Sequence, residues 1–243
     1  MVRALLDGSK TQTRRVIKPQ PTGEPRPLSE WSAGLAAACH DHSPDANKLV
    51  AHSERLIGKI FPFTTESGSL MSPRCPYGQP GDRLWVRETW RIGAWSEDDG
   101  EIAVDYMADN HSRREWLQVP EADDFEKYWL QCSDDCNKAG IQTDEDGKYH
   151  WEPGQSPCRI RPSIFMPRWA SRITLEIISV HVERLQDIDV TDCCCEGAPI
   201  ADGLPNQTHA VETWYRELWE KINGDGSWDA NPWVWVISFK RIK

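Results

Sequence analysis

The chain has 243 residues, 39% of them hydrophobic and 27% charged, values that are ordinary for a globular protein. No apolar run approaches the roughly 18 residues of a membrane span, so we expect no membrane segment. Charged residues interrupt the first 18 positions, so we expect no signal peptide and a cytoplasmic location. The formal net charge of −10 argues against a non-specific nucleic-acid binder.

The apolar residues predict short elements of both types. The predicted elements, in chain order, are a helix over 2–8 ending at Gly8, a less regular helix over 31–39, a strand over 84–88 after the turn at 80–82, a strand over 173–182, a helix over 191–196 with Thr191 as a possible N-cap, an amphipathic helix over 211–222 and a last strand over 233–239. No internal repeat is found.

Two long segments lack a clear period, at about 19–74 and 91–160, and we interpret them as insertions. The second is acidic: residues 97–146 contain sixteen Asp or Glu and four Lys or Arg, a net charge of −12. The rest of the chain is therefore about +2, and residues 1–26 hold six basic and two acidic side chains. An acidic, irregular insertion thus masks a mildly basic remainder that is suited to face a phosphate.

The sharpest local motif is Gly8-Ser9-Lys10-Thr11-Gln12-Thr13-Arg14-Arg15. A lysine set into a pocket is desolvated, which lowers its pKa and lets it act as a base or an electrostatic clamp. Thr13 could supply a nucleophile or orient a water, and Arg15 could bind a phosphate or carboxylate. On spacing alone, a solvated basic loop after a helix is the better interpretation.

Gly8-x-Lys10-x-x-x-x-Arg15 resembles the GxKxxxxR signature of the ASCH domain, a member of the PUA-like superfamily. Further pieces follow in the order of that family and cover about half of the chain, at residues 1–18, 78–90, 172–197 and 232–242. Longer phrases at 10–19, 167–172 and 228–233 resemble ASCH-like proteins of enterobacterial prophages. The resemblance implies one α+β domain over 1–243, a mixed or antiparallel PUA-like β-barrel with flanking helices.

The small ASCH proteins that hydrolyse N4-acetylcytidine use a lysine, a threonine and a glutamate, which correspond to Lys10, Thr13 and Glu196 here. The resemblance therefore implies a hydrolase that removes an acyl group from the exocyclic nitrogen of a cytidine-type nucleoside or base. Two alternatives stay open: a non-catalytic RNA- or DNA-binding module that recognises a modified base, and an ASCH-type ribonuclease. For Glu196 by itself, a solvated helix carboxylate is the better interpretation.

Several basic, aromatic and amide side chains are candidates for contacts to a modified nucleoside or a single-stranded nucleic acid. The candidates are Arg14, Arg15, Trp85, Arg168, Arg172, Asn231 and Trp233. Arg168 and Arg172 belong to a basic run that begins at Arg159 and Arg161. The alternative is that this run pairs with the acidic segment.

The eight cysteines include three in succession, Cys193 to Cys195, which does not suit a disulfide framework, and we expect reduced thiols. Cys132, Cys136, His150 and Cys158 are candidates for zinc, although their spacing lacks the usual paired knuckles. We therefore expect no metal and no cofactor. The sequence does not determine the oligomeric state.

Overall fold

The computed structural model describes residues 1–21, 63–64, 70–71, 74–108, 115–199 and 207–243. These residues divide into two compact units, one formed essentially by the described parts of 3–84 and 175–242, and the other by those of 85–174. The predicted helix over 31–39 and most of the predicted insertion at 19–74 lie outside the described residues. None of the helices in the described ranges is long and apolar enough to cross a membrane.

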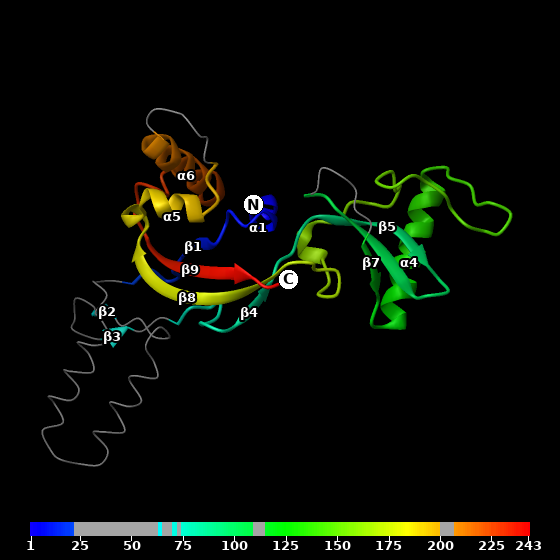
Figure 1. The fold of residues 1–243 in the computed structure, drawn as a ribbon, viewed down its shortest axis with the longest axis horizontal. Helices are drawn as coiled ribbons and strands as arrows, with labels where there is room; N and C mark the ends of the chain where they lie inside the picture. Colours follow the sequence, from blue (N-terminus) through cyan, green and yellow to red (C-terminus); the bar gives the residue numbers. More distant parts are fainter. Residues whose placement is uncertain (22–62, 65–69, 72–73, 109–114, 200–206) are drawn as a thin grey trace, which may run out of the picture. The chain divides into compact units, whose positions relative to one another are not determined.

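The first unit is built on a four-stranded antiparallel sheet in the order β1-β9-β8-β4 (Figure 1). Its strands are β1 (Gln12–Val16), β9 (Trp233–Arg241), β8 (Thr174–Arg184) and β4 (Arg83–Trp85), and the long strands β8 and β9 curl like half of a barrel. A short antiparallel pair, β2 (Phe63–Thr64) and β3 (Leu70–Met71), precedes β4. The α+β class with a curled antiparallel sheet agrees with the prediction at this coarse level.

Three helices accompany this sheet: α1 (Val2–Leu6), α5 (Val190–Cys195) and α6 (Gln207–Asn223). Side chains alternate along β9, so Val234 and Val236 pack in one cluster with Tyr215 and Trp219 of α6, while Trp235 packs in a second cluster. Because both faces of β9 are buried, its sequence is a nearly continuous apolar run.

Within the described residues of this unit, the predicted helices and strands are present, with shifted ends. The helix predicted over 191–196 begins one residue earlier, and its N-cap is Asp189 and not Thr191, because the Asp189 carboxylate accepts a hydrogen bond from the backbone N–H of Asp192 at 2.8 Å. The last helix begins at Gln207, four residues before the predicted start.

The second unit corrects the prediction of an irregular segment over 91–160. Strands β5 (Trp90–Ser96), β6 (Glu101–Tyr106) and β7 (Glu115–Gln118) form an antiparallel sheet, and α4 (Ala122–Lys138) is a 17-residue helix (Figure 1). The unit has its own core, in which the rings of Trp90, Tyr128 and Trp169 meet with centroids 5.8–6.2 Å apart. The missed signal is the alternation of Ile102, Val104 and Tyr106, which the acidic residues before and within this strand, including the buried Asp105, obscure.

Candidate functional site

The structure brings Lys10 and Glu196 together in the first unit. The Lys10 ammonium donates to Glu196 Oε2 at 2.6 Å and to the Glu196 backbone carbonyl at 2.8 Å. The two side chains are only 4% and 5% exposed. Because water cannot compete for its hydrogen bonds, a buried charge pair keeps a fixed geometry.

Backbone contacts at the ends of two helices position this pair. Gly8, with a φ of 83°, follows α1, and the Lys10 N–H then donates to the Ala4 carbonyl at 2.8 Å. Glu196 is the C-cap residue of α5, and an isolated antiparallel bridge joins it to Lys10. Gly197 follows with a φ of 94°, and a Cβ placed there would lie 3.3 Å from the Lys10 Cβ. The glycine therefore allows the close approach of the two segments.

Arg14 extends the pair into a buried charge network. Its guanidinium donates to Glu183 Oε1 at 2.7 Å through Nε, and to Asp192 Oδ2 at 2.6 Å through Nη2. Its Nη1 donates to Gln12 Oε1 at 2.9 Å and reaches Glu196 Oε1 at 3.5 Å. Since carboxylates from β8 and α5 occupy this guanidinium, Arg14 positions Glu196 and is not available to bind a phosphate.

Burial governs the electrostatics of Lys10. Desolvation lowers the pKa of the Lys10 ammonium below its ordinary value of 10.5 and outweighs the attraction of Glu196, which raises it. The positive charges of Arg15 and Arg14 lower this pKa further. Lys10 can therefore give up a proton more easily than a lysine in water, while two contacts to Glu196 hold its protonated form in place.

A cavity of about 390 Å³ opens beside the pair. Lys10, Glu196 and Arg15 line its polar side, and α6 supplies an apolar wall that includes Trp214 and Trp219. The indole N–H of Trp219 is buried without a hydrogen-bond partner among the described residues. A pocket with an apolar wall and a few convergent polar groups is the usual form of a small-molecule site.

Thr13 lines the same cavity, but no hydrogen bond joins it to Lys10 or Glu196 within the described structure. Successive side chains of a strand point to opposite faces, so Thr13 projects away from the face on which Arg14 meets its carboxylates. The Thr13 hydroxyl is buried and has no hydrogen-bond partner among the residues that the structure describes. An unpaired buried hydroxyl costs free energy that a bound water or ligand group recovers.

The other predicted binding residues of the first unit are divided between the cavity and the framework. Arg15 lines the cavity, half-buried, and its Nη1 donates to the Arg14 carbonyl at 2.9 Å. Asn231 instead accepts a hydrogen bond from the Gln186 backbone N–H at 2.9 Å through its side-chain oxygen. Trp233 is buried, and the guanidinium carbon of Arg184 lies 4.2 Å from its ring centroid. Asn231 and Trp233 therefore stabilise the sheet and the loop before β9, and neither lines the cavity.

Trp85, Arg168 and Arg172 belong to the second unit. The Trp85 ring lies under the guanidinium groups of Arg87 and Arg168, at 4.6 and 5.8 Å from its centroid. Arg172 donates through Nε and Nη2 to the two carboxylate oxygens of Glu88, both at 2.9 Å. The Glu88 carboxylate therefore occupies the Arg172 guanidinium, which is not available to bind a ligand.

The basic run that precedes these residues meets acidic and aromatic side chains. Arg159 pairs with Asp135 of α4 at 2.5 Å, and Arg161 is buried with its guanidinium carbon 5.3 Å from the Trp90 ring centroid. For Arg159, the alternative of pairing with the acidic segment is thus the one found in the structure.

The four zinc candidates do not form one site. Cys132, Cys136 and Cys158 are buried thiols, whereas the exposed His150 pairs with Asp144 at 2.5 Å. Across the described ranges, no three His, Cys, Asp or Glu side chains are grouped so that they could hold a metal ion. Burial raises the pKa of the Cys136 thiol to about 12, which keeps it protonated and a poor ligand.

No known protein family, curated protein or solved structure matches this chain.

Sequence reasoning missed the groups that hold and cover the site. Glu183 and Asp192 fix Arg14, and the aromatic residues of α6 form a cavity wall. Glu183 lies near the end of strand β8, and Asp192 lies in the first turn of α5, where a carboxylate is ordinary. No pattern in the sequence connects them to Arg14, because the contacts span 169 and 178 residues.

Proposed function

We propose that the first unit is an ASCH-like, PUA-like domain whose Lys10–Glu196 pair hydrolyses an amide on the exocyclic nitrogen of a cytidine-type nucleoside or base. The buried pair at the cavity is the observation that carries this proposal. A desolvated lysine held by a carboxylate beside an apolar cavity is suited to acid–base chemistry on a small, flat substrate. The order of the ASCH-like pieces along the sequence supports the same conclusion.

The chemistry that suits this pair uses Glu196 as the base and Lys10 as the acid. Glu196 accepts a proton from a water molecule, whose oxygen attacks the acyl carbon. The Lys10 ammonium stabilises the negative charge that develops on the acyl oxygen. When the C–N bond breaks, Lys10 donates a proton to the leaving nitrogen. Glu196 then returns its proton to Lys10 across their 2.6 Å contact, leaving the carboxylic acid and the free amine.

Thr13 has no step in this scheme, because within the described residues it makes no hydrogen bond to the pair, and it projects from the opposite face of β1 to Arg14. Trp214 of the cavity wall would stack on the base, since a planar base packs well on an aromatic face. Arg14 orients Glu196 through its 3.5 Å contact to the carboxylate.

The test is cytidine release from N4-acetylcytidine, followed by chromatography. Lys10→Met and Glu196→Gln should each lower kcat/KM at least about 100-fold, the usual contribution of a positioned acid or base. Lys240 and Glu176 form a matched control, because their 3.1 Å ion pair lies on the same sheet but is far more exposed, at 56% and 28%. Lys240→Met and Glu176→Gln should stay within about twofold of the parent.

Other outcomes separate the alternatives. Cytidine release that survives both substitutions at the buried pair would remove Lys10 and Glu196 from the chemistry. Saturable binding of N4-acetylcytidine without turnover would favour a module that reads a modified base. Cleavage of single-stranded RNA, lost in Lys10→Met, would favour a ribonuclease.

A further inference from the structure

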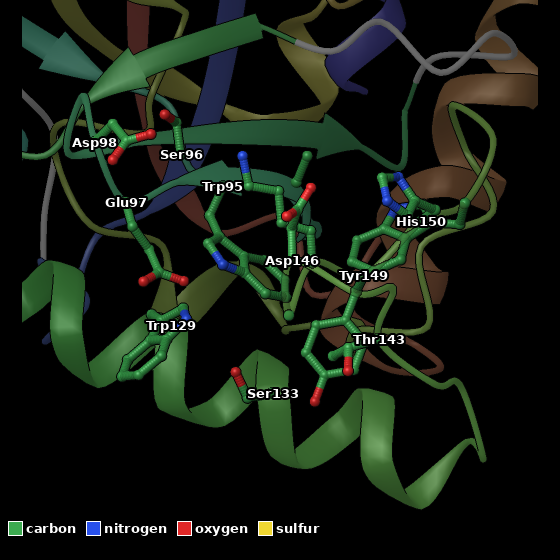
Figure 2. Close-up of a pocket in the computed structure, with 14 residues that line it drawn as sticks. Trp95, Ser96, Glu97, Asp98, Trp129, Ser133, Thr143, Asp146, Tyr149 and His150 are labelled. Carbon is green, nitrogen blue, oxygen red and sulfur yellow. The ribbon is translucent and has the colours of Figure 1, made fainter.

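The second unit contains a larger cavity, of about 670 Å³, which the proposed hydrolase chemistry does not use (Figure 2). It is bounded by the end of β5, by α4 and by the segment 143–151. Four aromatic side chains line it: Trp95, Trp129, Tyr149 and Trp151. Its size falls within the range of roughly 300–1,000 Å³ that is common for small-molecule sites.

Three of these rings are held in place by the protein itself. The Trp95 ring centroid lies 5.6 Å from that of Trp151 and 6.0 Å from that of Tyr149, with interplanar angles of 51° and 61°. The Trp151 indole N–H donates to the Gly93 carbonyl at 2.7 Å, and the Tyr149 hydroxyl donates to Asn137 Oδ1 at 2.9 Å. The rings therefore form a preorganised, angled wall, which lowers the entropy cost of binding a ligand.

The carboxylates at this cavity lack balancing charges. Glu97, Asp98 and Asp146 line it, and none of them forms an ion pair with any residue that the structure describes. Figure 2 shows the carboxylate groups of Glu97 and Asp146 among the aromatic side chains. Lys148 is the one lysine in the lining, and His150 is engaged with Asp144. The lining therefore has an excess of negative charge, within a segment whose net charge is −12.

Aromatic faces and carboxylates attract the same kind of ligand. The face of an aromatic ring carries partial negative charge and attracts ammonium groups, and a desolvated cation gains more from it than an exposed one does. A bare metal ion would instead need several oxygen ligands close together, and the described residues contain no such group. A phosphate or a nucleic acid would be repelled by the carboxylates.

We propose that this cavity binds a small organic polycation with alkylammonium groups, of the polyamine class. Its methylene chain would pack on Trp95 and Tyr149, and its ammonium groups would meet Glu97 and Asp146. This proposal does not rest on the proposed hydrolase function, because every residue that carries it lies in the second unit.

The experiment is calorimetric titration of the full chain with spermidine in 0.15 M salt. We expect one saturable site. Trp95→Ala and the double variant Glu97→Gln, Asp146→Asn should each weaken binding about tenfold, in line with the loss of one cation–π contact or of two carboxylates. Trp116→Ala and Glu126→Gln are the matched controls, because Trp116 is an exposed tryptophan and Glu126 an exposed α4 carboxylate, and neither lines the cavity. Both controls should bind as the parent does.

Two ligand comparisons complete the test. Mg²⁺ should not compete with spermidine at matched ionic strength, and a neutral diol of similar length should not bind. Equal competition by Mg²⁺, or spermidine affinity unchanged by Trp95→Ala, would overturn the proposal and leave only diffuse attraction to an acidic surface. A trilysine peptide that binds more tightly than spermidine would also overturn it, in favour of a basic protein segment.

Discussion

Replacement of Arg14 by methionine tests the buried charge network most directly. Methionine is apolar and of similar length, so the change removes the charge while much of the packing is kept. The Arg14 side chain is 0% exposed and meets Glu183, Asp192 and Glu196, whose side chains are 18%, 29% and 5% exposed. Arg14→Met therefore removes the cation that three carboxylates share, and of these only Glu196 keeps a lysine partner among the described residues, Lys10.

The expected loss of stability is about 3 kcal/mol. Breaking a buried ion pair by removing one partner costs about 3–5 kcal/mol, and the lower end applies because Glu183 and Asp192 retain some contact with water. For a protein of this size, that loss corresponds to a drop in Tm of roughly 6–12 °C. Differential scanning calorimetry of both proteins measures it. Arg216→Met is the control, because Arg216 is half-exposed and lies 3.4 Å from the exposed Asp229, a pair worth about 0.5 kcal/mol or less.

The loss should also depend on pH. Burial by itself would raise the pKa of the Glu183 carboxyl, but the hydrogen bond from His181 and the charge of Arg14 hold it below its ordinary value of 4.5. A lowered carboxyl pKa stabilises the folded state above the unfolded pKa, and this stability is lost as the pH falls through the folded pKa. The difference between parent and Arg14→Met should therefore be complete above pH 4.5 and shrink below it. A loss no larger than that of Arg216→Met at pH 7 would refute the reasoning.

Two further predictions concern the geometry and charge of the site. Gly197→Ala places a Cβ 3.2–3.3 Å from Ala4 and Lys10 at a φ of 94°, so it should destabilise the fold by about 2–3 kcal/mol and lower turnover. The control is Gly224→Ala, at a φ of 98° with open space around it, which should cost only about 1–2 kcal/mol and leave turnover unchanged. Equal effects of the two variants on turnover would contradict the close approach at Gly197. Turnover needs a protonated Lys10, whose pKa is below 10.5, so the rate should fall at alkaline pH before 10.5 is reached. Arg15→Met removes a positive charge that lowers the pKa of Lys10, so it should move this fall to higher pH. A kinetic pH profile of both proteins measures the shift, and an unchanged profile would show that Arg15 does not affect the pKa of Lys10.

Local patterns predict most of the regular elements of the first unit. Strands β8 and β9 are rich in β-branched and aromatic residues, and α6 has an amphipathic period, so each is recognisable without its neighbours. The second unit was expected to be only partly ordered, because its apolar period is short in each strand and is interrupted by acidic residues such as the buried Asp105. Its order depends on packing between β5, β6 and α4, which no local window contains.

The sequence by itself determines that a lysine follows a helix-ending glycine, and the resemblance alone connects it to Glu196. Only the tertiary structure decides that the two side chains meet at 2.6 Å and that Arg14 is occupied by Glu183 and Asp192. The same holds for the angled rings around Trp95 in the second unit. The physical reason is common to both sites: charge pairs and ring contacts act over a few ångströms, and only folding brings residues so far apart in the chain within that distance.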